Sequence, residues 1–191
     1  MNSSKRTQKL SYLRYVIWIY ECCLMSVEQG REIDAIVGFL QRIGLSVSRG
    51  EVGPDSFLPG LAVCAGMLLI DESRLEYPGD LLHEAGHLAV MTPAERKACN
   101  GDAGPDGGAE MAAIAWSYAA ALEIGLDPQV VFHAGGYKSG GAAIVENFAQ
   151  GRYIGVPLLQ WFGLTTDLPR HGEVDGEEAV CYPKMKRWVR E

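Results

Sequence analysis

An apolar stretch that carries two histidines and a glutamate is the feature that most restricts how this chain can fold. It has the sequence PGDLLHEAGHLAV, residues 78–90, and holds His83, Glu84 and His87. Residues four apart on an α-helix are separated by about 40° around the axis and by one turn along it. In a helix, the two imidazoles therefore face the same point, and Glu84 lies about 100° around the axis from His83.

This spacing is typical of a hydrolytic metal site. Two neutral imidazoles on one helix face can be neighbouring ligands of a tetrahedral Zn2+ ion. Glu84 can instead reach the metal-bound water and act as its general base. The flanking residues are apolar, so the helix is expected to be buried, and a buried cluster of this kind needs a partner that offsets its desolvation. We predict a zinc site on His83 and His87, against the alternative of a half-buried histidine pair bonded to backbone or carboxylates.

The third ligand is predicted in the next strongly helical segment, residues 107–125, with the sequence GGAEMAAIAWSYAAALEIG. Its many alanines favour a helix and permit another helix to approach closely. Glu110 lies at its start, where a carboxylate on a regular helix can be held rigidly against the first helix. We predict Glu110 as the third metal ligand, with His133 and His171 as rivals.

HEAGH followed by GGAEMAAIAWSYAA resembles the gluzincin branch of the zincin metallopeptidases, in which a downstream glutamate completes a His2Glu site. The likeness covers roughly residues 66–125. The NExxSD-type sequence common in that branch is absent, and the metzincin extension is excluded because Val90 and Pro93 replace its glycine and histidine. The resemblance implies a zinc peptidase that acts on a peptide or protein substrate. A non-catalytic metal-binding or regulatory protein, and a zinc hydrolase of a non-peptide amide, are the alternatives.

Three further features are interpreted in the light of that chemistry. A zinc hydrolase needs a donor to the oxyanion, and the turn FHAGGYKSGG offers His133 and Tyr137 as catalytic candidates, with a purely structural turn as the alternative. Ser117 shares the helix face of Glu110 and could bond a ligand, or be only a small residue at a helix contact. The resemblance implies an edge strand that binds substrate, and GMLLID (residues 66–71) is the candidate, against a plain core strand.

The order of elements predicts an α+β fold. We expect a single, mostly helical zincin-like domain over residues 1–191, with a small antiparallel sheet beside the HExxH helix. Helices are expected over about residues 6–28, ended by Gly30, and over about 31–43, so that residues 1–44 form a helical pair packed on the domain. The basic tail KMKRWVR is interpreted as a solvated segment, with docking of a partner or lid as the alternative.

Composition narrows the partners and the compartment. A net charge of −7 over 191 residues argues against a nucleic-acid binder. No stretch reaches the roughly 18 uncharged apolar residues of a membrane span, and no secretion signal is convincing. The five cysteines form no CxxC pair and favour reduced thiols, so we expect a cytoplasmic protein without membrane or nucleic-acid partners.

Overall fold

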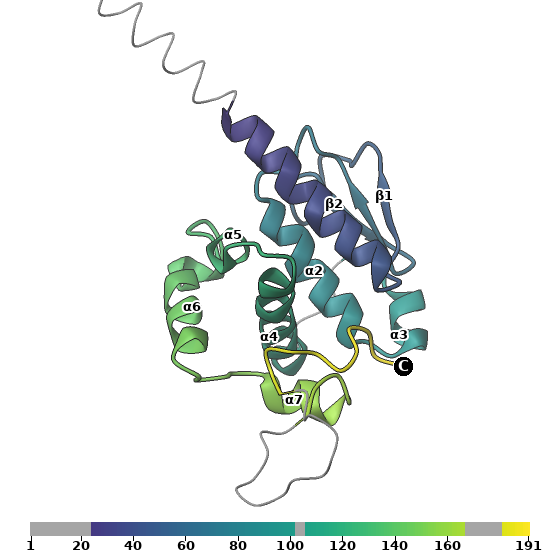
Figure 1. Ribbon diagram of the computed structural model, residues 1–191. Coiled ribbons are helices and arrows are strands. Elements are labelled where there is room, and N and C mark those ends of the chain that lie inside the picture. Colours follow the sequence, from purple (N-terminus) through teal and green to yellow (C-terminus); the bar gives the residue numbers. More distant parts are fainter. Residues whose placement is uncertain (1–23, 102–105, 167–180) are drawn as a thin grey trace, which may run out of the picture. The chain divides into compact units, whose positions relative to one another are not determined.

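The computed structural model describes residues 24–101, 106–166 and 181–191 (Figure 1). The chain divides into two compact units, Met1–Ala35 and Ile36–Glu191. Residues 24–42 are helical without interruption, so the predicted helix end at Gly30 is wrong. Gly30 does not adopt the positive φ of a glycine that terminates a helix, and its neighbours continue the helical hydrogen bonding. Most of the helix predicted over residues 6–28 lies outside the described residues, and the packing of residues 1–44 stays a prediction.

Three short strands form a mixed sheet in the second unit. They are β1 (Val47–Arg49), β2 (Leu61–Cys64) and β3 (Met67–Ile70), in the spatial order β1-β3-β2. β2 and β3 pair antiparallel, as expected for the sheet, but β1 pairs with β3 in parallel, so the predicted antiparallel sheet is wrong in this respect. The path of the chain explains the parallel pair. After β1, residues 50–60 cross to the opposite edge of the sheet, where β2 runs antiparallel to β1. β3 then reverses direction again and lies between β1 and β2, parallel to β1.

The central place of β3 also decides the role of GMLLID. This strand has β1 on one side and β2 on the other, so it cannot bind a substrate strand and is the core strand of the alternative interpretation. The outer edge of the sheet next to the helices of the site belongs to β2. There the carbonyl of Val63 accepts a hydrogen bond from the Gly101 amide at 2.9 Å, and Leu58 forms a bridge with Leu61.

Two helices form the centre of the second unit, and shorter helices surround them. α2 (Pro78–Val90) and α4 (Gly107–Glu123) lie side by side (Figure 1), and β3 packs on α2. α5 and α7 contact α4, and α6 contacts α5 and the short helix η1. The bounds of the remaining helices are α3 (Pro93–Ala98), α5 (Pro128–Val131), η1 (Tyr137–Ser139), α6 (Gly141–Ala149) and α7 (Val156–Trp161). This is the predicted α+β class, with helices predominant.

The ends of α2 follow from local chemistry. Pro78 occupies the first turn, where its missing amide hydrogen costs nothing, and the helix ends at Val90. Thr92 then starts α3 with a capping box, in which its hydroxyl accepts from the Glu95 amide and the Glu95 carboxylate accepts from the Thr92 amide. Apart from Asp80 and His83, every residue of α2 is buried, as the apolar sequence predicts.

α2 and α4 approach each other closely at Gly86. A Cβ atom added to Gly86 would lie 3.0 Å from the carbonyl oxygen of Ala113 and 3.2 Å from the Trp116 ring. The facing side of α4 is built from small residues, and Ala112, Ala113, Ala119 and Ala120 are all at most 1 % exposed. The alanine-rich helix therefore permits the close approach expected from the sequence, and the glycine of HEAGH supplies the matching space.

The basic tail is folded, contrary to its interpretation as a solvated segment. The Trp188 ring packs edge-on against Phe39 at 4.9 Å and against Trp116 at 5.7 Å. The Trp116 indole donates a hydrogen bond to the Trp188 carbonyl at 2.7 Å, and the Arg190 amide donates to the Ala89 carbonyl at 2.8 Å. The ring of Trp188 packs on other aromatic rings, while Lys184, Lys186 and Arg187 remain exposed.

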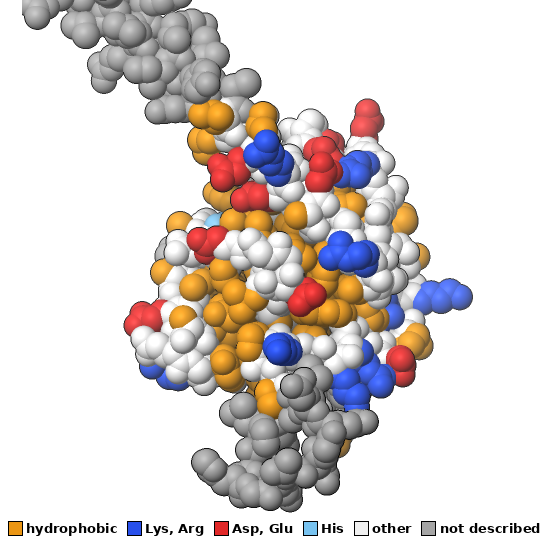
Figure 2. All heavy atoms as spheres, viewed as in Figure 1, with side chains coloured by type: hydrophobic (Ala, Val, Ile, Leu, Met, Phe, Trp, Pro, Cys, Tyr) orange, Lys and Arg blue, Asp and Glu red, His pale blue; other side chains and the backbone are white. Residues whose placement is uncertain are grey.

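Hydrophobic side chains also reach the surface of the molecule. Figure 2 shows them gathered over the middle of the viewed face, with charged side chains scattered among and around them. In the second unit, Trp161 and Phe57 are the most exposed large ones, at 83 % and 71 %. Within the described ranges, no helix is long and apolar enough to cross a membrane.

The contact at Gly86 can be tested by adding a side chain. We expect Gly86→Leu to destabilise the fold by about 1–3 kcal/mol, because the added atoms force α2 and α4 apart. In a chain of this size that lowers the melting temperature by roughly 3–10 °C. Gly38→Leu is the control, since a Cβ there meets only the Arg42 guanidinium at 3.8 Å and leucine favours a helix. Equal melting temperatures of the two variants, measured by circular dichroism, would contradict the close contact.

Candidate metal centre

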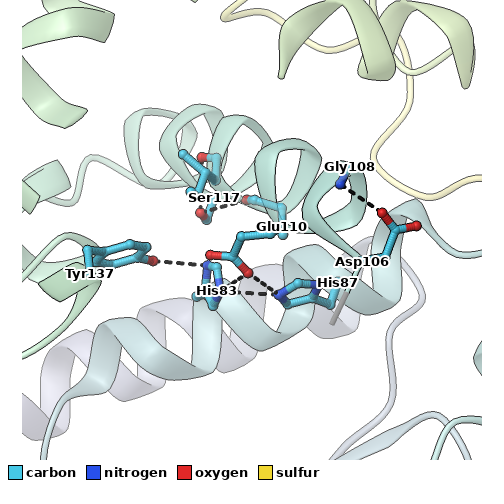
Figure 3. A network of polar contacts seen from close by, with 9 residues as sticks. His83, His87, Asp106, Gly108, Glu110, Ser117 and Tyr137 are labelled. Carbon is cyan, nitrogen blue, oxygen red and sulfur yellow. Dashed lines mark hydrogen bonds and ion pairs between the residues drawn. The ribbon is translucent and has the colours of Figure 1, made fainter. Parts of the chain in front are cut away.

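Three side chains of α2, those of His83, Glu84 and His87, converge beside α4. The Nε2 atoms of His83 and His87 are 3.2 Å apart, and their rings are perpendicular (Figure 3). A ligand atom of Glu84 completes a group whose members all lie within 4.8 Å of one another, and Glu84 and His87 are buried. The cluster predicted from HEAGH is therefore present and could hold a metal ion.

Glu110 reaches this cluster from the first turn of α4. Its Oε2 atom lies 3.1 Å from Nε2 of His87 and 3.5 Å from Nε2 of His83. With the 3.2 Å between the two nitrogens, the three atoms form a nearly equilateral triangle. Ligands of a tetrahedral zinc ion at about 2.0–2.1 Å lie about 3.3–3.4 Å from one another. The size of the triangle suits such an ion.

The charge of Glu110 is set by the same contacts. Hydrogen bonds from His83 and then His87 hold the pKa of its carboxyl well below the usual range, although partial burial opposes them. The group is therefore an ionised carboxylate, the form that binds a cation. The Glu110 side chain is 45 % exposed, whereas that of His87 is 7 % exposed. Solvent therefore reaches the cluster at Glu110.

Tyr137, in η1, contacts the far side of the His83 ring. Its hydroxyl oxygen lies 2.9 Å from Nδ1 of His83, and the two rings are perpendicular. Burial raises the pKa of Tyr137 above its ordinary value, and the nearby carboxylates, Glu110 first, raise it further, so the phenol keeps its proton. The predicted role as an oxyanion donor stays a prediction, and in the described conformation the hydroxyl faces a histidine nitrogen.

His133 has partners outside the cluster. Its Nε2 atom lies 2.9 Å from Oδ1 of Asp80, and its ring stacks on Tyr77 with centroids 3.7 Å apart. Its catalytic role and its role as third ligand stay predictions, but the contacts that it makes belong to the start of α2. The other rival ligand, His171, lies outside the described residues.

Ser117 is the small residue at a helix contact, not a partner of a ligand. Its hydroxyl donates to the carbonyl of Ala113 at 2.8 Å, one turn earlier on α4, and its side chain is fully buried. Asp106, the residue before α4, caps this helix by accepting a hydrogen bond from the Gly108 amide at 2.8 Å (Figure 3). That cap fixes the first turn of α4 and with it the backbone of Glu110.

A pocket of about 400 Å³ adjoins Glu84 and was not predicted from the sequence. Residues 55–58 form one wall and β2 forms the other, so the lining is mostly apolar and includes Phe57, Leu61 and Val63. Its residues come from an irregular turn and a short strand, and no sequence pattern brings these together. A larger cavity of about 610 Å³ lies between α3, α4 and α7, but its lining does not include His83, Glu84, His87 or Glu110.

Comparison with known proteins finds no matching family model, no matching curated protein and no matching solved structure. The likeness to zincins therefore rests on the cluster of His83, Glu84 and His87.

Metal binding by the cluster is directly measurable. We expect the protein to hold about one zinc ion per chain after metal-replete expression, and His83→Ala and His87→Ala to hold less than about 0.2. Zinc at 100 times its Kd should also stabilise the wild type by about 2.7 kcal/mol. His133→Ala tests the rival ligand: its side chain is 12 % exposed and has Asp80 and Tyr77 as partners, so this variant should keep most of the bound zinc. Equal loss of metal in all three variants would contradict the assignment to the cluster.

Proposed function

We propose that this protein is a zinc-dependent hydrolase, with a peptidase as the leading assignment. His83, His87 and Glu110 are the metal ligands in this proposal, and Glu84 is the general base. The observation that carries it is the triangle of two Nε2 atoms and one Oε2 atom, with sides of 3.1, 3.2 and 3.5 Å. Two imidazoles and a carboxylate with an open fourth position are typical of catalytic rather than structural zinc sites.

The solvent exposure of Glu110 supports a catalytic site in particular. A structural zinc ion is enclosed by four protein ligands, whereas here the Glu110 side chain is 45 % exposed. When bound, zinc would polarise a substrate carbonyl and make a water molecule acidic enough to attack it near neutral pH. The side chains of the protein then have to hold the ion, remove the proton of that water and deliver a proton to the leaving group.

Glu84 is suited to the proton transfers. Its carboxylate is buried next to the two imidazoles, and it also lines the apolar pocket formed by β2 and residues 55–58. A substrate group in that pocket would lie beside the carboxylate. Glu84 would accept the proton of the attacking water and return it to the leaving amine.

The choice of a peptide substrate rests on the resemblance of the motif to gluzincins. It is supported by the pocket beside Glu84, which residues of β2 and residues 55–58 line with mostly apolar side chains. A non-peptide amide would use the same metal and base. A non-catalytic metal-binding protein would keep the metal but show no dependence of turnover on Glu84.

The third ligand is tested by a change of charge on α4. We expect Glu110→Gln to weaken zinc binding by at least about 100-fold, because the amide oxygen carries no negative charge. Glu123→Gln makes the same change at an exposed position near the end of the same helix and should leave zinc affinity unchanged. Affinities are measured by competition with a chromophoric chelator. If His171→Ala weakens zinc binding and Glu110→Gln does not, the rival ligand is correct.

The general base is tested separately from the metal. Glu84→Gln keeps the size of the side chain but cannot accept a proton, so we expect wild-type zinc content and a loss of turnover of about 10²–10⁴-fold. Turnover is followed with a library of quenched-fluorescence peptides and with simple amides. Full activity of Glu84→Gln would exclude the role of base. Zinc binding without turnover of any substrate by the wild type would favour the non-catalytic alternative.

A further inference from the structure

The contact between Tyr137 and His83 involves the ring nitrogen that does not face Glu110. The Nε2 atom of His83 points to the triangle, 3.5 Å from the Glu110 carboxylate, and Nδ1 lies on the other side of the ring, 2.9 Å from the Tyr137 hydroxyl. We propose that Tyr137 is a positioning residue of the metal centre, whose hydroxyl accepts the Nδ1–H of His83 and so turns its Nε2 lone pair toward the ion. This inference rests on the proposed zinc site.

The hydrogen-bond inventory of the two groups supports the role. A neutral imidazole carries one proton, so a ring that binds metal through Nε2 must carry it on Nδ1, and that N–H needs an acceptor when it is buried. A hydroxyl is both donor and acceptor. The same contact at 2.9 Å can therefore persist when Nε2 carries the proton, with the phenol donating to Nδ1 instead. Tyr137 can hold the ring in one orientation whether or not a metal is bound.

The backbone of η1 is strained where it presents this side chain. Tyr137 and Lys138 have φ values of 53° and 51°, so two consecutive residues with side chains adopt the left-handed conformation. Such a conformation costs free energy and persists only where the surroundings fix it. Here the Tyr137 ring packs on Phe132 with centroids 5.2 Å apart and on the edge of His83.

The segment that carries Tyr137 is tied to α2 at two points. His133 bonds Asp80 at 2.9 Å, and four residues later Tyr137 bonds His83, which lies one turn after Asp80. Both contacts are made on the same side of α2, so the turn between them runs along the helix. The position of the hydroxyl is thus set by the helix that carries the ligand itself.

The second histidine of the cluster has no equivalent partner. The Nδ1 atom of His87 is buried and has no hydrogen-bond partner among the residues that the structure describes. Of the two imidazoles, only that of His83 has its far nitrogen held by a side chain in this part of the chain. The orientation of His83 is therefore expected to depend on one hydroxyl, and its removal should be measurable.

The test compares two tyrosines whose hydroxyls bond different groups. Tyr137→Phe removes the contact with His83 and keeps the ring. Tyr182→Phe removes another hydroxyl, which donates to the Ala115 carbonyl of α4 at 2.8 Å from a side chain that is 6 % exposed. Zinc affinity of the full-length protein is measured by chelator competition at a temperature far below both melting points. We expect Tyr137→Phe to weaken zinc binding by about 10–100-fold and Tyr182→Phe to leave it unchanged.

A second measurement separates positioning from stability. In the zinc-loaded wild type, the imidazole N–H of His83 should exchange slowly with water because it is bonded to the phenol, and exchange should accelerate in Tyr137→Phe but not in Tyr182→Phe. Equal zinc affinity of wild type and Tyr137→Phe, or equal weakening in both variants, would overturn the positioning role and leave the zinc site intact. Absence of zinc binding by the wild type would overturn both proposals.

Discussion

The close packing of α2 against α4 is the interaction on which the rest of the structure depends. Gly86 lies between the two histidines of HEAGH and faces Ala113, one turn after Glu110 on the other helix. The distance between the helices at this point decides whether the Glu110 carboxylate reaches the imidazoles. Because Gly86 and the alanines of α4 bury little surface individually, the long apolar residues of the unit have to hold the pair from outside. Phe39 and Trp188 do so on one side, where they pack against Trp116 of α4.

Burial of the cluster also lowers the free energy of unfolding. His87 is buried with its Nδ1 atom lacking a partner among the described residues, and a buried polar atom without a hydrogen bond costs about 1–3 kcal/mol. Two imidazoles and two carboxylates in this space also lose hydration. An ion bound through the Nε2 atoms would compensate part of this loss, so the stability of the protein and the occupancy of the site are expected to rise together.

The cluster and the helices that carry it could be predicted from the sequence, but the contacts between distant segments could not. The boundaries of α2, the capping box at Thr92 and the approach of α4 follow from local signals, namely Pro78, the spacing of Thr92 and Glu95, and the run of alanines. The parallel pairing of β1 could not be predicted, because it depends on the path of residues 50–60 around β3. The pairing of Asp80 with His133 and the packing of Trp188 against Trp116 are likewise long-range, and the charged residues around Trp188 favoured the interpretation of a solvated tail.

The tail has a consequence for how the protein is made. Its contacts join Trp188 to Trp116 and Arg190 to Ala89, so segments separated by about half the chain meet beside the helices of the cluster. Contacts between residues so far apart in sequence form late, since the intervening chain must first be ordered. During synthesis, HEAGH and Glu110 leave the ribosome long before Trp188 does. The proposed metal ligands are thus synthesised before the packing that fixes their spacing is complete.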